Sequence, residues 1–178
     1  MAHFEKELSR QDIFQGRVID VKLHQVELEN GKTATREVAH HNGGACVVAI
    51  DDQGRLLLVR QYRFAVGETL LELPAGKLEK VEDPLPAAAR ELEEETGYKA
   101  DSLTLLTPMI PTPGYCSERI CIYLAQGLTP TAQKLDEDEF LSVERVPFDR
   151  ALAMVAAGEL TDAKTQVGIL LAARLLGK

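Results

Sequence analysis

The chain has 178 residues, of which 45% are hydrophobic and 27% charged, as expected for one globular domain of ordinary size. Its formal net charge of −8 at pH 7 opposes binding to nucleic acid, and an anionic substrate would need a bridging cation. No apolar run approaches the roughly 20 residues that cross a bilayer, and the polar N-terminus lacks a signal-peptide core, so we expect a cytoplasmic protein without a membrane partner.

The first predicted elements are two long strands within residues 14–38, joined at Asn30-Gly31, a dipeptide typical of hairpin turns. The apolar stretch 43–51 (GGACVVAID) predicts a buried strand, and the turn after it predicts an antiparallel partner at 55–64. Further strands are predicted at 70–76, which stops at Pro74-Ala75-Gly76, at 101–110, at 118–127 and after an acidic loop at 136–139.

An internal helix is predicted from 84 to 96. Asp83 is a good N-cap, Pro84 suits the first helical position, and Gly97 is typical of the residue after a helix. Two later helices are predicted, one from Pro147 to Gly158 and one capped by Thr161 or Asp162. Strands on both sides of an internal helix, with helices at the end, indicate a mixed α/β sandwich.

The stretch RELEEETG (90–97) places four carboxylates at the negative end of this helix, where acids are unfavourable. At 100° per residue, Glu91, Glu94 and Glu95 form one acidic stripe, and Glu93 points elsewhere. The stripe expected to be buried contains Leu85, Ala88, Ala89, Leu92 and Thr96. Hard divalent cations prefer such oxygen clusters, so the stripe indicates a metal site. A solvated acidic face with Arg90 paired to Glu94 is the alternative.

The residues around this stripe form a longer pattern. Gly76 is followed after five residues by Glu82, and seven more residues lead to Arg90-Glu91-Leu92-Glu93-Glu94-Glu95-Thr96-Gly97-Tyr98. This resembles the Nudix box, GX5EX7REUXEEXGU with U apolar, at every specified position if Tyr98 counts as apolar. The resemblance implies a Nudix hydrolase with the α/β/α sandwich fold and a mixed sheet. It also implies hydrolysis of a nucleoside diphosphate linked to another group.

By position in the box, the resemblance implies that Glu91, Glu94 and Glu95 bind catalytic divalent ions, usually Mg²⁺, with Mn²⁺ as a substitute. Glu94 then belongs to both the catalytic and the metal-binding residues. In related pyrophosphatases the carbonyl of the residue before the box glycine, here Ala75, also ligates metal. Bound divalent ions would neutralise a diphosphate and lower the pKa of a bound water.

Other box residues have supporting roles by the same resemblance. Arg90 would orient the glutamates, and Glu82 would pair with a basic residue or bind metal through water. A purely structural salt bridge is the alternative for Glu82 and Arg90. Gly76 and Gly97 are expected to have backbone roles, because turns and helix ends often need positive φ.

Two downstream segments resemble ADP-ribose pyrophosphatases. Pro113-Gly114, followed by Glu118 in SER, resembles their substrate loop, although a plain Pro-Gly turn is the alternative. The acidic loop at 136–139 resembles their mobile loop, in which a glutamate serves as catalytic base or extra metal ligand. Glu139 is the first candidate for that role and Glu137 the second, and a solvated charge run is the alternative reading.

The N-terminal residues 1–40 are expected to be a β extension ahead of a Nudix domain at 41–178. The extension resembles the piece that ADP-ribose pyrophosphatases exchange across a twofold dimer, which implies a homodimer with shared pockets. Arg36 and Glu37 would then reach the partner's nucleotide, and Arg63 would contact the adenosine or terminal ribose side. Simple solvent exposure is the alternative for these three residues.

The sequence therefore predicts divalent-metal-dependent hydrolysis of ADP-ribose to AMP and ribose 5-phosphate. The nearest alternative is the same chemistry on another nucleoside diphosphate sugar, such as ADP-glucose or GDP-mannose, because a few pocket hydrogen bonds decide between such substrates. A non-catalytic ADP-ribose sensor is an alternative of another class, and the complete set of box glutamates argues against it.

Overall fold

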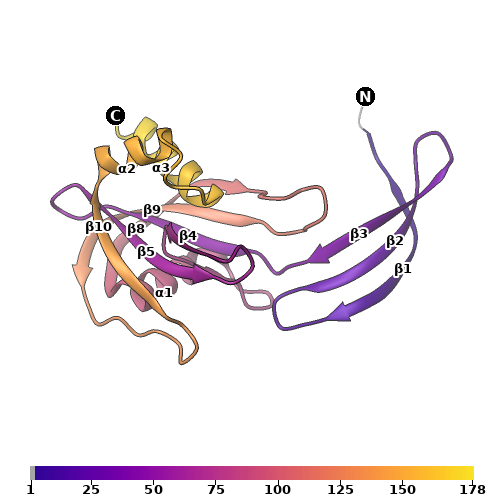
Figure 1. Cartoon of the computed structure of the whole chain (residues 1–178), viewed down its shortest axis with the longest axis horizontal. Helices are drawn as coiled ribbons and strands as arrows, with labels where there is room; N and C mark the ends of the chain where they lie inside the picture. The colour runs from indigo at the N-terminus through magenta and orange to yellow at the C-terminus, as the bar shows by residue number, and fades with distance from the viewer. Residues whose placement is uncertain (1–2) are drawn as a thin grey trace. The chain divides into compact units, whose positions relative to one another are not determined.

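The computed structural model describes residues 3–178 and divides into two compact units (Figure 1). Unit 1 contains the described residues up to Gly43 together with Ile110–Arg119. Unit 2 contains Gly44–Met109 and Ile120–Lys178. The grouping of residues 110–119 with the N-terminal strands was not predicted from the sequence.

Unit 1 is built on a three-stranded antiparallel sheet in the order β1-β2-β3. The strands are β1 (Lys6–Gln15), β2 (Asp20–Glu27) and β3 (Thr33–His40). The predicted hairpin is confirmed, with Gly31 at φ 77° in its turn. The sequence did not predict β1, because all ten of its residues are exposed and no apolar alternation marks it. Segment 110–119 joins the end of β3, where Ala39 N donates to Tyr115 O at 2.7 Å.

Unit 2 contains two sheets, in the orders β7-β4-β9-β8 and β10-β5-β6. The strand β4 pairs in parallel with β9 and antiparallel with β7, so the first sheet is mixed, as predicted. The strands are β4 (Gly44–Ala49), β5 (Arg55–Arg63), β6 (Glu68–Glu72), β7 (Ala75–Lys77), β8 (Tyr98–Met109), β9 (Ile120–Pro130) and β10 (Leu141–Pro147).

The predicted pairing of strand 43–51 with strand 55–64 is wrong. A single bridge, Ile50 to Leu56, joins them at the turn, after which β4 and β5 enter different sheets. All six residues of β4 are buried, and the strand occupies the centre of its sheet between β7 and β9. Its parallel partner lies far along the chain, so the local turn could not reveal it.

The strand predicted at 70–76 is split in two. Strand β6 ends at Glu72 in one sheet, and β7 begins at Ala75 in the other. Pro74 lies between them and has no N–H to donate to a ladder, which suits a point where the chain changes sheets. The predicted stop at Ala75-Gly76 is therefore wrong, because these residues open β7.

The three predicted helices are confirmed as α1 (Pro84–Thr96), α2 (Phe148–Ala156) and α3 (Ala163–Leu175). The Asp83 side chain accepts a hydrogen bond from Leu85 N at 3.0 Å, and Gly97 adopts φ 69° at the other end of α1. Of the two candidate caps of α3, Asp162 fills the role, accepting from Thr165 N at 3.0 Å.

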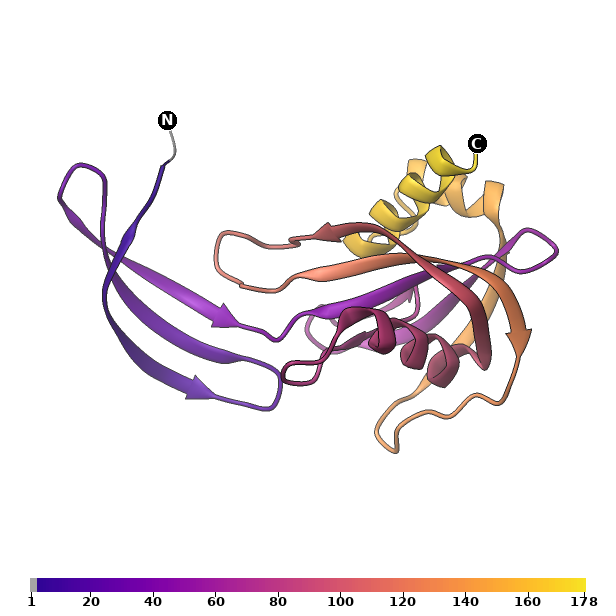
Figure 2. The same ribbon diagram turned by 180° about the vertical axis from the view of Figure 1, so that it is seen from behind.

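Two hydrophobic cores hold unit 2 together, one on each face of its sheets. One joins α2 and α3 to β4, β5 and β9, and the other joins α1 to the opposite face of the same strands. Figures 1 and 2 show the resulting layers, with α1 on one side and α2 and α3 on the other. The predicted α/β/α sandwich is confirmed. Across the described residues 3–178, no helix has the length and apolarity that a membrane span requires.

Candidate active site

The buried face of helix α1 lies closer to its acidic stripe than the sequence predicted. Leu85 and Ala89 were expected to be buried and are exposed. The buried residues of the helix are Ala87, Ala88, Leu92, Glu95 and Thr96. The buried face is therefore turned toward the carboxylates, and α1 packs that face against β4, β7 and β8. The turn of the helix brings Glu95 and Glu91 into the interior.

Gly76 in β7 lies directly against Glu91. A Cβ added at residue 76 would lie 2.0 Å from the carboxyl carbon of Glu91, closer than any non-bonded contact allows. No positive φ is recorded at Gly76, so the expected conformational reason for this glycine is wrong. Gly76 instead provides space for a carboxylate, whereas Gly97 does adopt the predicted positive φ.

Glu95 is 1% exposed and receives one backbone hydrogen bond, from Ala75 N to Oε2 at 2.8 Å. Burial raises its pKa to about 8, and the nearby charges of Glu139 and Glu91 act in the same direction. Within the described chain, no lysine or arginine forms an ion pair with Glu95. An ionised carboxylate that is buried without a cation is costly. A positive charge bound beside Glu95 would therefore be stabilising.

Arg90 links the other acidic residues of the box. Its Nη1 lies 2.7 Å from Glu91 Oε1 and 2.8 Å from Glu94 Oε2, and its Nη2 lies 3.4 Å from Glu82 Oε1. Burial opposes its charge, but Glu91 and Glu94 raise the pKa of Arg90 above its ordinary value. Burial also raises the pKa of Glu91, against the opposing effect of Arg90. Arg90 thus has the contacts needed to orient Glu91 and Glu94, and Glu82 makes the salt bridge that was one of its two expected roles.

The chain after β9 is anchored on the carboxyl end of α1. Thr131 N donates to Gly97 O at 2.7 Å, Lys134 N donates to Glu94 O at 2.9 Å, and Gln133 Nε2 donates to Glu95 O at 2.6 Å. These bonds satisfy carbonyls that a helix end leaves without partners. The sequence did not predict these contacts, which join residues 34 or more positions apart.

The acidic loop brings one of its two candidates toward the box. Glu139 is half-buried, and its charge raises the pKa of both Glu91 and Glu95. It lines a surface pocket of about 440 Å³ together with Tyr62 and Phe140. Glu137 is exposed and does not line that pocket. The arrangement favours Glu139 over Glu137 as the residue that acts with the box.

Arg63 lies at the end of β5 and forms a two-point ion pair with buried Glu72. Arg63 Nε lies 2.7 Å from Glu72 Oε1, and Nη2 lies 3.0 Å from Oε2. Lys164 of α3 contacts the same Glu72 carboxylate. The Arg63 side chain remains 39% exposed, so it is not enclosed by these contacts. Arg63 was predicted from the sequence, but Glu72 and Lys164 were not, because their partnership joins two distant segments.

The remaining predicted site residues lie in unit 1. Arg36 Nε donates to Glu5 Oε2 at 3.0 Å, and Glu37 beside it is exposed. Pro113 and Gly114 are exposed in a turn, which is closed by Cys116 N donating to Thr112 O at 3.1 Å. Glu118 Oε1 lies 3.5 Å from His41 Nδ1. Unit 1 thus contains five predicted residues: Arg36, Glu37, Pro113, Gly114 and Glu118.

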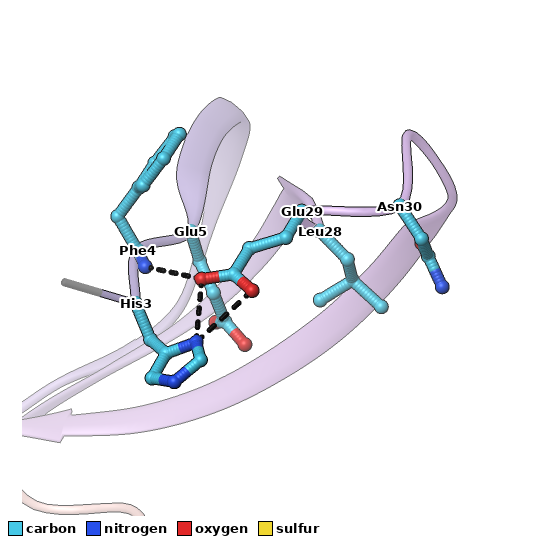
Figure 3. Close-up of a pocket in the computed structure, with 6 residues that line it drawn as sticks. All are labelled: His3, Phe4, Glu5, Leu28, Glu29 and Asn30. Atoms are coloured by element: carbon cyan, nitrogen blue, oxygen red, sulfur yellow. Dashed lines mark hydrogen bonds and ion pairs between the residues drawn. The ribbon is translucent and has the colours of Figure 1, made fainter. Parts of the chain in front are cut away.

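Unit 1 also has a pocket of about 660 Å³ near the β2–β3 turn (Figure 3). There the Glu29 carboxylate accepts from Phe4 N at 3.1 Å and lies 2.9 Å from His3 Nδ1. Of residues 3–178, none that the sequence proposed for the site lines this pocket. The pocket therefore has no part in the candidate site.

The chemistry of the box residues fits a hard divalent cation, because carboxylate and carbonyl oxygens are its preferred ligands. As they stand, no three His, Cys, Asp or Glu side chains in the described part of the chain converge closely enough to hold a metal ion. Arg90 engages both Glu91 and Glu94. The oxygens that could hold such an ion are the carboxylates of Glu91, Glu94 and Glu95 and the carbonyl of Ala75.

The chain matches two protein families. Residues 40–166 match the NUDIX domain, and residues 5–39 match the nucleoside diphosphate sugar hydrolase N-terminal domain.

Relatives similar to this chain carry several activities. The ADP-ribose pyrophosphatase of Bacillus subtilis is 44% identical, with 93% of this chain and 90% of that protein covered. The methanol dehydrogenase activator of Bacillus methanolicus is 40% identical with the same coverage. A GDP-mannose pyrophosphatase of Yersinia pestis is 34% identical, over 73% of this chain and 70% of its own. A solved structure of an ADP compounds hydrolase matches with a TM-score of 0.86 and 27% identity, covering 97% and 94% of the two chains.

Proposed function

This chain belongs to the Nudix hydrolase family, and from that membership we propose that it hydrolyses ADP-ribose to AMP and ribose 5-phosphate. The observation that carries the proposal is the complete box, in which Arg90 contacts Glu91, Glu94 and Glu82 while Glu95 is buried against Ala75. The ADP-ribose pyrophosphatase from Bacillus subtilis, similar over 93% of this chain, supports the choice of substrate.

Nudix hydrolases generally need divalent metal ions, and we propose Mg²⁺ here, with Mn²⁺ able to replace it. When bound, such an ion neutralises the diphosphate and makes water a better nucleophile. The protein's contribution is to place the carboxylates: Gly76 leaves space for Glu91, and Arg90 orients Glu91 and Glu94. Ala75 fixes Glu95 by donating its N–H.

Glu139 is the proposed general base. In the reaction, the oxygen of a water forms a bond to one phosphorus, and the bond between that same phosphorus and the bridging oxygen breaks, so that the bridging oxygen leaves with the other phosphate. Glu139 would accept a proton from that water, and the leaving phosphate would take up the displaced charge. The half-buried position of Glu139 and its electrostatic effect on Glu91 and Glu95 support this role over one for Glu137.

Substrate contacts are proposed for three groups of residues. Arg63, 39% exposed beside the box, would contact the nucleotide or terminal ribose as a cation. Pro113, Gly114 and Glu118 would form the substrate loop. The match of residues 5–39 to the N-terminal domain of nucleoside diphosphate sugar hydrolases supports a role in substrate binding for Arg36 and Glu37.

We also propose a homodimer that acts in the cytoplasm, with Arg36 and Glu37 of one protomer reaching the nucleotide of the other. Light scattering tests the dimer directly. A mass near twice that of the 19.6 kDa chain is expected, and a mass near that of one chain would rule out the shared pocket.

A second candidate function is the same reaction on GDP-mannose or ADP-glucose. The similarity to a GDP-mannose pyrophosphatase favours it, although that relative covers only 73% of this chain. The chemistry at the diphosphate would be unchanged, and the difference would lie in hydrogen bonds to the base and sugar.

A substrate panel with Mg²⁺ tests the proposal. ADP-ribose, ADP-glucose and GDP-mannose are compared by kcat/KM, and the products are identified individually. ADP-ribose is expected to react fastest, giving AMP and ribose 5-phosphate in equal amounts. If ADP-glucose or GDP-mannose reacts faster, the choice of substrate is wrong; if none is cleaved, the proposed activity is wrong.

A further inference from the structure

We infer that Lys164 is a positioning residue for the metal site. Together with Thr165, it fixes the segment 72–75, whose residue Ala75 donates a hydrogen bond to Glu95. The inference rests on the proposed function, in which Glu95 and Ala75 hold a divalent ion. Lys164 itself is not placed in contact with substrate or metal. Its effect is transmitted through the chain that joins β6 to β7.

The Glu72–Ala75 segment needs support from outside the sheets. The chain changes sheets here, because β6 ends at Glu72 and β7 begins at Ala75. Pro74, between them, cannot donate a ladder hydrogen bond. The segment is thus held less by strand pairing than the strands on either side of it, although Val47 N donates to Pro74 O at 3.0 Å.

Lys164 supplies part of that support through Glu72. Glu72 is 1% exposed, and its carboxylate contacts both Arg63 and Lys164. The Lys164 side chain is 11% exposed, against 39% for Arg63, so solvent screens its contact less. Lys164 Nζ also lies 3.0 Å from Asp162 Oδ2, the cap of α3. Lys164 therefore ties the last residue of β6 to the start of α3.

Thr165 continues the tie to the next residue of the segment. It is fully buried, and its Oγ1 accepts from Leu73 N at 2.8 Å while donating to Asp162 Oδ2 at 2.6 Å. Gly168, one turn later in α3, allows close packing here. A Cβ at residue 168 would lie 2.6 Å from Leu73 Cδ1. The helix thus holds Leu73 by both a hydrogen bond and direct packing.

The other end of the segment reaches the box. Ala75 N donates to Glu95 Oε2 at 2.8 Å, and the adjoining Gly76 leaves space for Glu91. Glu72 and Leu73 are therefore held by α3, and Ala75 holds Glu95 through its N–H, with a single residue between Leu73 and Ala75. Displacing the first pair would move the Ala75 N–H that orients Glu95 and the Ala75 carbonyl proposed as a metal ligand. Groups that orient metal ligands commonly influence affinity in this way.

The test measures Mn²⁺ binding to the full chain in the absence of nucleotide. Binding is monitored through the electron paramagnetic resonance signal of free Mn²⁺. Lys164→Met and Thr165→Val are each expected to weaken Mn²⁺ binding about tenfold. Thr165→Ser keeps the hydroxyl and should bind within about twofold of the unmodified protein. Arg55→Met is the matched control, because it breaks an ion pair with Asp51 at the opposite end of β5 from Arg63.

The outcomes separate positioning from general stability. Urea unfolding is measured for every variant, because loss of a buried ion pair also lowers the free energy of unfolding. If Lys164→Met and Thr165→Val lose stability but bind Mn²⁺ as tightly as the unmodified protein, the inference is overturned. Should Lys164→Met fail to fold, the comparison of Thr165→Val with Thr165→Ser decides, and equal Mn²⁺ affinities overturn it.

The same measurement distinguishes the inference from the proposed function. If the unmodified protein binds Mn²⁺ normally but does not cleave ADP-ribose, the proposed substrate is wrong. The Mn²⁺ affinities of the variants then still decide the positioning role. No saturable Mn²⁺ binding by the unmodified protein would overturn both.

Discussion

The carboxyl carbon of Glu91 lies 2.0 Å from the point that a Cβ on Gly76 would occupy. The two residues come from different elements, β7 and α1, and they meet where the helix turns its acidic stripe inward. Ordinary carbon contacts lie near 3.5–4.0 Å. The box thus begins with glycine because even a methyl group would displace the Glu91 carboxylate from its position.

The first prediction is that Gly76→Ala lowers activity while preserving the fold. The atoms that the new methyl group would meet belong to the end of a flexible side chain, so the Glu91 carboxylate moves and the backbone does not. We expect kcat/KM for ADP-ribose to fall about a hundredfold, equivalent to about 2.7 kcal/mol. The free energy of unfolding in urea should change by less than about 1 kcal/mol.

A double-mutant cycle with Glu91→Gln checks the cause. If the methyl group acts by displacing the carboxylate, Gly76→Ala should lower kcat/KM little further once Glu91 has been replaced. Losses that add fully would show that the alanine acts by another route.

The second prediction separates the glutamates of α1. Glu94→Gln should lower kcat about a hundredfold with Mg²⁺, because Glu94 contacts Arg90 at 2.8 Å and is a proposed metal ligand. Glu93→Gln is the matched control one residue away. Glu93 forms a surface ion pair with Lys99 at 3.1 Å, which contributes at most about 1 kcal/mol to stability. Glu93 has no proposed part in the reaction. A fully active Glu94→Gln protein would contradict the metal-ligand role.

The sequence predicted α1 and its caps well because their determinants are local. Asp83, Pro84 and Gly97 each act within one helical turn, and the box has fixed spacing. The burial of the helix was less predictable, since the exposure of Leu85 and Ala89 depends on which strands the helix packs against. Periodicity gives the angle between residues, and tertiary packing decides which angle faces inward.

Contacts between distant segments were missed for the same reason. The partnership of Glu72 with Lys164 joins residues 92 positions apart, and neither residue has a local pattern that names the other. The pairing of β4 with β9 in place of β5 is similar, because a tight turn suggested a hairpin that the sheets do not contain. Turn signals report the turn, and the strand order depends on which buried faces fit together.

The third prediction concerns Glu95 and pH in the absence of divalent metal. Burial raises its folded-state pKa to about 8 from an ordinary value of 4.5, so between these pH values the folded state holds a proton that the unfolded state has released. The contribution to stability is therefore full below about pH 4.5 and is lost as pH rises toward 8. The slope for one such group is at most about 1.4 kcal/mol per pH unit.

Glu95→Gln isolates this contribution, because glutamine keeps an acceptor for Ala75 N and has no charge. Urea unfolding with a chelator present should show the stability of the unmodified protein falling, relative to Glu95→Gln, between pH 5 and 8. Added Mg²⁺ should stabilise the unmodified protein at pH 8 more than the variant. Parallel pH profiles for the two proteins would show that Glu95 ionises normally.

The last prediction concerns Gly97, which ends α1 and supports the loop leading to Glu139. Gly97 and Gly158 both have positive φ, at 69° and 73°, but their surroundings differ. A Cβ on Gly97 would lie 2.9 Å from Gln133 N, whereas a Cβ on Gly158 would meet nothing within 4 Å.

Gly158→Ala should lower the free energy of unfolding by about 1 kcal/mol through backbone strain alone. Gly97→Ala should lower it further and also reduce kcat, because the displaced backbone at 131–134 anchors the acidic loop on the helix. Urea unfolding and steady-state kinetics on both variants check this; equal losses of stability with unchanged kcat would show that the anchor does not position Glu139.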